Sequence, residues 1–138
     1  MYYKDLSQIT PTGRLFQVPT LPAALELAFR SPRHGGGLVA ADARGRAANA
    51  ACGDELELEF QVRDGRITAA GFRVRGCSGL IACAELLCVD LEGRSCADAR
   101  GYDLAARVSE LGGLPPARRH ALEVCRRALE QAFPATPA

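Results

Sequence analysis

The sequence predicts an α+β fold, a small antiparallel β-sheet of about three strands with helices packed mainly on one face. Residues 55–62 alternate between polar and apolar side chains, which is the period of a strand with one buried face. Asp64-Gly65 follows and favours a tight hairpin turn. The segments 21–30 and 79–91 instead place apolar residues at i, i+3 and i+4, as amphipathic helices do.

The first helix is expected to begin at Pro22, because proline suits the first helical turn. We expect it to end near Ser31-Pro32, ahead of a run of glycines. Residues 38–51, rich in alanine and arginine, are interpreted as a strand and a loop before the hairpin. The apolar face of the helix carries Leu21, Leu25, Ala28 and Phe29.

The return strand of the hairpin is predicted over residues 67–75. Side chains alternate strictly in an uninterrupted strand, but here the apolar phase changes after Ile67, since the next apolar positions are Ala70, Phe72 and Val74. We therefore expect a β-bulge, with one inserted residue, near Gly71.

Capping signals mark the helices of the second half. Ser78 is expected to cap the helix over 79–91, and Gly93 to end it. Ser95-Cys96-Ala97-Asp98 resembles a capping box in which aspartate replaces glutamate. Short helical turns are therefore expected over 95–111.

A last helix is predicted from Pro115-Pro116 to about Phe133, after Gly112-Gly113 breaks the preceding turns. Its spacing of apolar residues predicts one continuous buried face. That face carries Ala121, Leu122, Cys125, Ala128, Leu129, Ala132 and Phe133.

A chain of 138 residues is long enough for one domain with its own core. We place this domain at 21–133, between an irregular N-terminal extension, 1–20, and a C-terminal tail, 134–138. The composition, 48% hydrophobic and 24% charged, is typical of a globular protein.

Charge and hydropathy exclude several classes of protein. The net charge of +1 gives no reason to expect nucleic-acid binding, and no apolar run reaches the roughly 18 residues of a membrane span. The first residues lack the apolar segment of a signal peptide. No Ser-His-Asp pattern, phosphate loop or pair of catalytic carboxylates is present, so we expect a cytoplasmic protein that is not an enzyme.

Six cysteines are many for this length, and in a reducing compartment they are thiols, metal ligands or redox groups rather than structural disulfides. No spacing gives Cys-x-x-Cys, which argues against a zinc finger or a thioredoxin motif. Cys52 precedes the predicted hairpin in Ala51-Cys52-Gly53-Asp54, and Cys77 follows it in Gly76-Cys77-Ser78-Gly79. The hairpin therefore brings both cysteines to the same end of the sheet.

The chain also carries a series of short motifs in order, namely Ser31-Pro32-Arg33 before the glycines, Cys52-Gly53-Asp54, Asp64-Gly65-Arg66, Phe72 with Gly76-Cys77, Leu114-Pro115-Pro116 and His120. Together they resemble the IscU/NifU N-terminal family, whose members are scaffolds for iron–sulfur cluster assembly. The resemblance covers about residues 21–133 and implies an IscU/SufE-like fold. It also implies three cysteines and an aspartate around the cluster, with a histidine beside the third cysteine.

Carried over residue by residue, the resemblance assigns as ligands Cys52, Asp54, Cys77 and His120. The third cysteine is replaced by Ala121. The segment Ile81-Ala82-Cys83-Ala84-Glu85 also departs from the family, which tends to carry serines there. The implied cofactor is an iron–sulfur cluster or iron, and the implied partners are a cysteine desulfurase and recipient apoproteins or a chaperone.

The donor types suit this assignment. Thiolates are soft ligands for iron and zinc, whereas an aspartate is a harder, weaker ligand from which a cluster is released more easily. Cys77 precedes a helix N-terminus, which favours the thiolate and makes it the best candidate to accept a persulfide sulfur. The four donors suffice for tetrahedral zinc, or for a two-iron cluster in which His120 serves where a cysteine usually does.

Each donor also has a purely structural interpretation. Cys52 and Cys77 would then be small buried apolar residues. Asp54 would be a turn-forming residue, and His120 would face solvent on its helix. The position of both cysteines at the ends of predicted elements favours the ligand interpretation.

The remaining cysteines are interpreted mainly as packing residues. Cys125 lies one helical turn beyond Ala121, so it is a substitute ligand only if the helix shifts. Cys83 lies beyond Cys77 on the same helix and could resolve a persulfide. The sequence favours structural places for these two residues, and likewise for Cys88 and Cys96.

Three functions stay open on the sequence. The first is an iron–sulfur scaffold, or a diverged relative, that binds a cluster, iron or zinc at the four donors. The second is a SufE-like persulfide acceptor that uses Cys77 and needs no metal; the retained Cys52-Gly53-Asp54 argues against it. The third is a non-catalytic interaction module that kept the fold and lost the chemistry. The sequence favours the first.

Overall fold

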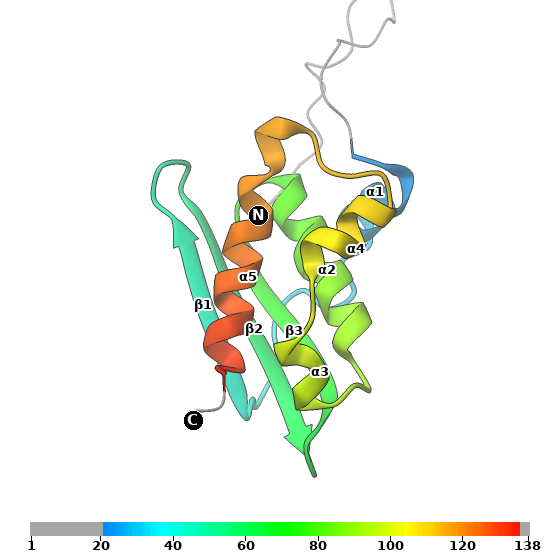
Figure 1. Ribbon diagram of the computed structural model, residues 1–138. Helices are drawn as coiled ribbons and strands as arrows, with labels where there is room; N and C mark the ends of the chain where they lie inside the picture. Colours follow the sequence, from blue (N-terminus) through cyan, green and yellow to red (C-terminus); the bar gives the residue numbers. More distant parts are fainter. Residues whose placement is uncertain (1–20, 136–138) are drawn as a thin grey trace, which may run out of the picture.

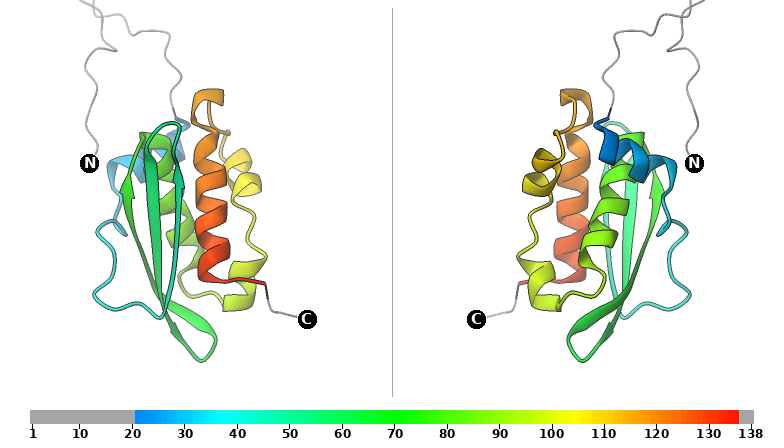
Figure 2. Two further views of the ribbon diagram at one scale, coloured as in Figure 1. Left: turned by 90° about the vertical axis from the view of Figure 1, so that its left-hand side faces the viewer. Right: turned by 90° about the vertical axis from the view of Figure 1, so that its right-hand side faces the viewer.

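The computed structural model describes residues 21–135, which contain an antiparallel sheet with strand order β1-β2-β3. The helices lie mainly on one face of this sheet (Figures 1 and 2), which confirms the predicted α+β fold. The predicted extension and the last three residues of the predicted tail lie outside the described residues, and the domain boundaries stay predictions. In chain order the elements are α1 (Ala23–Arg30), β1 (Ala43–Asn49), β2 (Asp54–Arg63), β3 (Arg66–Arg75), α2 (Ser78–Leu91), α3 (Cys96–Arg100), α4 (Leu104–Glu110), the 3-10 helix η2 (Pro116–Arg118) and α5 (His120–Ala132).

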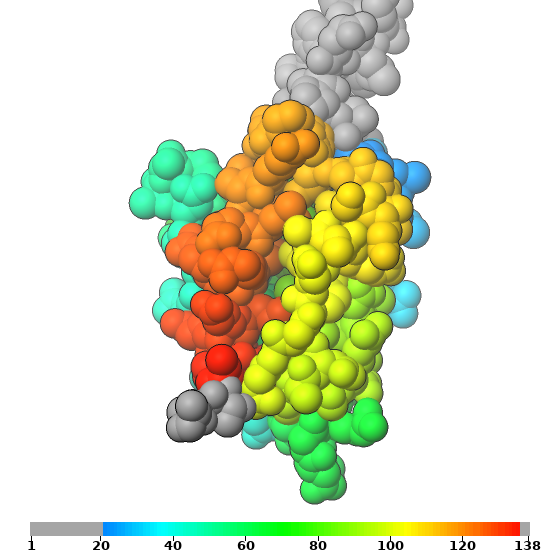
Figure 3. Space-filling model, in the orientation of Figure 1, coloured from blue at the N-terminus to red at the C-terminus, as the bar shows by residue number. Residues whose placement is uncertain are grey.

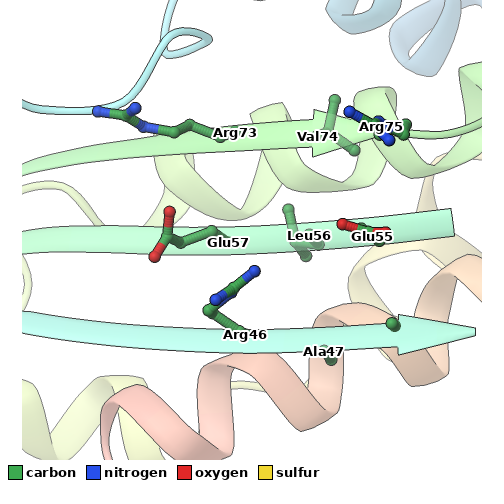
Figure 4. Close-up of a pocket in the computed structure, with 9 residues that line it drawn as sticks. Arg46, Ala47, Glu55, Leu56, Glu57, Arg73, Val74 and Arg75 are labelled. Carbon is green, nitrogen blue, oxygen red and sulfur yellow. The ribbon is translucent and has the colours of Figure 1, made fainter.

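β2 alternates as predicted, with its apolar side chains facing the helices. The buried residues of that face include Leu56, Leu58 and Phe60. Glu57 lies on the outward face, between its register partners Arg46 of β1 and Arg73 of β3 (Figure 4). Because one face of the sheet is apolar and the other polar, a slip of one residue would bury charges, and this specifies the register.

The hairpin turn and the bulge of β3 lie close together. Both residues of Asp64-Gly65 have positive φ, 52° and 75°, as the predicted two-residue turn requires. The register of the two strands shifts directly after this turn and leaves Thr68 as the inserted residue. The bulge predicted near Gly71 is therefore wrong in position, because the phase change is absorbed beside the turn and Gly71 keeps a regular partner on β2.

Two long helices cover the apolar face of the sheet, α2 against β3 and α5 against β1 (Figures 1 and 2). α5 approaches β1 so closely that a Cβ at Gly45 would overlap the carbonyl group of Ala128. α1 packs against α2, and α4 contacts both α2 and α5. The core therefore lies between the sheet and the α2–α5 layer.

The helix starts correct two sequence predictions. α2 begins at Ser78 with Cys77 as its N-cap, so Ser78 is already helical and is not the cap. The predicted last helix is divided into η2 and α5, because the N–H groups of residues 118 and 119 bond three residues back, which gives a 3-10 turn. The predicted cap at Ser95 is confirmed, since its Oγ accepts a hydrogen bond from the N–H three residues later at 3.0 Å.

Among the described residues, no helix combines the length and the apolar character that a membrane span requires. The cytoplasmic location expected from the sequence stays a prediction.

Candidate metal centre

The four predicted donors come together at one end of the sheet. Cys52 lies in the turn between β1 and β2, and Asp54 is the first residue of β2. Cys77 follows β3 as the N-cap of α2, and His120 is the first residue of α5. The ends of these elements lie side by side at the top of Figure 1, so segments far apart in the sequence supply the donors.

The donor atoms converge without any side chain between them. His120 Nε2 lies 2.7 Å from Asp54 Oδ2, and Cys77 Sγ lies 3.8 Å from Asp54 Oδ2 and 3.7 Å from His120 Nε2. Cys52 lies near two of these residues, because its sulfur and single donor atoms of Asp54 and His120 all lie within 4.8 Å of one another, in a set that does not include the Cys77 sulfur. Asp54 is buried, Cys77 and His120 are half-buried and Cys52 is exposed, so the group opens to solvent on the Cys52 side.

This geometry suits a metal better than a catalytic relay. A thiol–imidazole–carboxylate triad uses the two ring nitrogens for two different partners. Here Nε2 of His120 alone faces both Cys77 and Asp54. In a tetrahedral zinc site a sulfur and a nitrogen ligand lie about 3.5 Å apart, given the usual zinc–ligand bond lengths. The 3.7 Å between Cys77 Sγ and His120 Nε2 is close to that separation. The 2.7 Å between His120 Nε2 and Asp54 Oδ2 is instead a hydrogen-bond distance, so this pair must open before both residues bind one ion.

Glycines let the segments that carry the donors approach one another. A Cβ at Gly76, directly after β3, would lie 2.7 Å from Asp54 Oδ1, so any larger residue there would displace the Asp54 carboxylate. A Cβ at Gly79 would lie 3.1 Å from the Cβ of Arg118. The first turn of α2 therefore packs against the segment before α5, and this places His120 beside Cys77.

The site lacks a third thiolate, as the sequence indicated. Ala121 is completely buried next to His120. Cys125 is also completely buried, and burial raises its pKa well above the ordinary range, with a further contribution from the nearby thiols Cys83 and Cys88. A thiol that resists deprotonation is a poor ligand. The role of Cys125 as a substitute ligand stays a prediction that this burial does not support.

Two other cysteines that the sequence assigned mainly to packing are core residues in the structure. Cys83 and Cys88 are completely buried on α2, and burial raises the pKa of Cys83 to about 12. Cys96 is half-buried at the start of α3. These positions agree with the packing interpretation of all three cysteines.

The sequence did not single out a second cluster of titratable groups, formed by His34, Glu85 and Glu92. Glu85 is 3% exposed, although it lies on α2, most of whose residues are apolar and buried. A charged residue within an apolar helical run was the signal that could have revealed it, because a buried carboxylate requires a partner.

Two surface hollows lie apart from the donors. One is on the outward face of the sheet and is lined by Arg46, Glu57 and Arg73 among others (Figure 4). The other is a furrow between α5 and the segment before α4, with Leu122 and Arg126 in its lining (Figure 3). None of the four donors lines either hollow.

Comparison with known proteins places the chain in a family. Residues 24–136 match the family model described as the NifU-like N terminal domain. The chain belongs to this family. The match includes Cys52, Asp54, Cys77 and His120, and it confirms the resemblance seen in the sequence motifs.

Named relatives cover most of the domain. IscU 1 of Archaeoglobus fulgidus, an iron–sulfur cluster assembly scaffold protein, is 31% identical over 105 residues, or 76% of this chain and 69% of the relative. IscU of Haemophilus influenzae, named likewise, is 31% identical over 109 residues, 76% of this chain and 86% of the relative. The nitrogen fixation protein NifU of Cereibacter sphaeroides is 38% identical over 112 residues, and this chain spans 45% of its length.

Solved structures share the fold at lower identity. A protein assigned to iron–sulfur cluster assembly for the SUF system of Fervidobacterium islandicum has a TM-score of 0.67 at 19% identity, over 80% of this chain and 94% of that one. The N-terminal part of a NifU-like protein from Brucella abortus has a TM-score of 0.54 at 18% identity, over 78% of this chain and 76% of that one. These two structures therefore share the fold of this chain.

Proposed function

We propose that this protein is a scaffold for iron–sulfur cluster assembly and that it holds iron, a cluster or zinc through Cys52, Asp54, Cys77 and His120. The observation that supports the proposal most is the convergence of these four donors from three separate parts of the chain. Relatives that are about one-third identical are named as such scaffolds. The donor set, two sulfurs with one nitrogen and one oxygen, suits both zinc and iron.

The surroundings of the donors suit temporary binding. Cys52 is exposed on a turn, so a bound group is accessible to a recipient protein from that side. Asp54 supplies an oxygen, which binds iron less strongly than a thiolate does. Cys77 and His120 lie at helix starts, where the backbone N–H groups favour an anionic ligand. A site of this kind retains its cargo weakly enough to pass it on.

Anaerobic reconstitution with ferrous iron and sulfide tests the proposal. Iron and sulfide per chain and the visible absorption of the cluster would be measured after gel filtration. We expect the wild type to retain a cluster or iron, Cys52→Ala to lose most of it, and Cys96→Ala to behave like the wild type, because Cys96 lies away from the donors. Equal loading of Cys52→Ala and wild type would contradict the assigned site.

One observation favours a second function, a SufE-like acceptor of persulfide sulfur. Cys77 is a half-buried N-cap that makes no capping bond with its side chain, and its sulfur lies beside an imidazole. Mass spectrometry after incubation with a cysteine desulfurase and cysteine tests this function. We expect one added sulfur on Cys77; sulfur on other cysteines only, or none, would argue against it.

The proposed partners follow from either function. A cysteine desulfurase supplies sulfur, and recipient apoproteins or a chaperone take part in release. The domain itself is proposed to bind and transfer rather than to catalyse turnover. A degenerate interaction module, the third possibility left by the sequence, predicts neither retained metal nor persulfide in the two experiments.

A further inference from the structure

A strap, residues 31–38, crosses the free edge of β3 between α1 and β1. The N–H of Phe72 on β3 donates a hydrogen bond to the His34 carbonyl at 3.0 Å. Farther along, the N–H of Leu38 donates to Glu59 Oε1 on β2 at 2.7 Å. The strap therefore runs from the helical side of the molecule to the outward face of the sheet. In Figure 2 the segment that follows α1 passes along the β3 side of the sheet.

The strap is attached to α2 and to the residue after it by one imidazole between two carboxylates. His34 Nδ1 lies 2.7 Å from Glu85 Oε2, and His34 Nε2 lies 3.1 Å from Glu92 Oε1. The backbone N–H of His34 donates to Glu85 Oε1 at 2.9 Å. The other oxygen of Glu92 accepts a hydrogen bond from the Ala70 N–H of β3 at 3.1 Å. We call His34, Glu85 and Glu92 the latch.

This geometry requires a particular protonation state. An ionised carboxylate only accepts hydrogen bonds, whereas a neutral imidazole has one N–H and one acceptor nitrogen. Both ring nitrogens of His34 face a carboxylate, so with both carboxylates ionised both nitrogens must carry a hydrogen. The latch as it stands therefore contains an imidazolium ion.

The charges around the ring agree with that state. Burial lowers the pKa of His34, but hydrogen bonds to Glu92 and Glu85, together with their charges, raise it by more, so the pKa lies above 6.5. In the described part of the chain, these two carboxylates are the charged groups that contact the ring. Nearby on β2, the charge of Glu59 is balanced by Arg44 and Arg73 at 3.5 and 3.7 Å.

We propose that the strap is a proton-controlled cover for the β3 edge, held closed by the imidazolium of His34 and released when that ring becomes neutral. A neutral ring would turn a nitrogen lone pair toward one carboxylate, and the two would repel. Glu92, whose side chain is 39% exposed, can turn to water, whereas Glu85, at 4%, cannot. The Glu92 contact is therefore the one lost first.

Release would uncover backbone groups of β3. Departure of Glu92 frees the Ala70 N–H, and a displaced His34 carbonyl frees the Phe72 N–H. Gly36 and Gly37, at φ 96° and 78°, lack side chains that would hold the strap in place. The result is an exposed strand edge, a surface that can pair with another extended segment. The latch lies outside the candidate metal centre, so this inference stands apart from the proposed function.

Hydrogen exchange of the full metal-free chain tests the proposal. Protection factors of the Ala70 and Phe72 amides, which correct for the intrinsic effect of pH, would be compared on both sides of the His34 titration and followed by NMR. We expect wild-type protection at both amides to fall as pH rises from 6.5 toward the raised His34 pKa, by about tenfold for each pH unit of that interval, and to level off above it. The Leu58 amide, inside the sheet, should show no such change.

Two variants separate the latch from general effects. His34→Gln should show low, pH-independent protection at both amides, whereas His120→Gln should keep the wild-type profile. The NMR titration of the wild type alone also decides: a His34 pKa at or below 6.5, or protection unchanged while His34 titrates, would overturn the proposal. This second readout holds even where His34→Gln does not fold.

Discussion

The two histidines of the protein both contact buried carboxylates, but in different ways. At the metal centre, one nitrogen of His120 faces both Asp54 and a thiol. In the latch, the two nitrogens of His34 face one carboxylate each. The first arrangement gathers different donors around a point that an ion can occupy. The second surrounds an imidazole that carries a hydrogen on each nitrogen, so neither nitrogen is available to bind a metal.

The two groups also differ in where their residues lie on the helices and strands. The donors at the metal centre lie at the starts of β2, α2 and α5 and in a turn, where one side is open to solvent. Glu85 lies in the middle of α2, 3% exposed, and its charge has no access to water. Asp54 is buried almost to the same extent, at 4% exposed. A histidine therefore becomes a ligand or a charged anchor according to which groups approach its two nitrogens.

The largest effect is expected from Glu85→Ala, which removes the buried partner of His34. Breaking a buried ion pair by deleting one member costs about 3–5 kcal/mol, so the free energy of unfolding in urea should fall by an amount of this order. Glu92→Ala is the matched control, and its exposed pair should contribute about 1 kcal/mol or less. Equal, small losses for both variants would show that the latch is not a buried pair.

The next largest effect is expected at the other histidine. His120→Ala should weaken zinc binding, measured by competition with a chromophoric chelator, by at least the roughly 10–100-fold that loss of a metal site's outer partner causes. His34→Gln should bind zinc as tightly as the wild type. If both substitutions weakened binding alike, the distinction between ligand and anchor would be wrong.

A smaller effect is expected from Ala121→Cys, which supplies the missing thiolate beside His120. An additional soft donor should slow removal of zinc or of a reconstituted cluster by a chelator, by about tenfold. Ala128→Cys is a matched control, since Ala128 is also completely buried on α5 but lies two turns away. A rate equal to that of the wild type in Ala121→Cys would mean that position 121 faces the core and not the site.

The smallest effect is expected from pH alone. Because the pKa of His34 is raised in the folded protein, its contribution to stability is complete below the unfolded value of about 6.5. That contribution is lost as pH rises through the higher folded value. Urea unfolding of the metal-free protein should show this decline in the wild type and a flatter profile in His34→Gln. If the stability of the wild type and of His34→Gln changed with pH in parallel, the latch would not contribute to the free energy of unfolding.

Local patterns in the sequence were enough to predict the hairpin of β2 and β3. The alternation over 55–62 and the Asp64-Gly65 turn depend on neighbours in sequence, and both are present in the structure. The position of the bulge was predicted wrongly because the change in apolar phase allows the inserted residue to stand at several positions. Only the pairing with β2 identifies it as Thr68. Likewise, periodicity alone did not separate η2 from α5.

The two histidine sites differ in how far the sequence could predict them. His120 and Asp54 lie 66 positions apart, and only the family's motif order linked them. His34 and Glu85 lie 51 positions apart, and no motif linked them. Long-range contacts between polar groups leave no periodic signal, so they become visible only when the helices and the sheet are packed.

The contact of α5 with β1 at Gly45 has a mechanical consequence for the metal centre. α5 packs on β1 at Ala128, and His120 is the first residue of the same helix, eight residues earlier and about 12 Å away. A side chain at residue 45 would push this helix away from the sheet, and the shift of the helix would move the imidazole relative to the two thiols. The absence of a side chain at residue 45, far from any donor, thus helps to decide where a ligand atom stands.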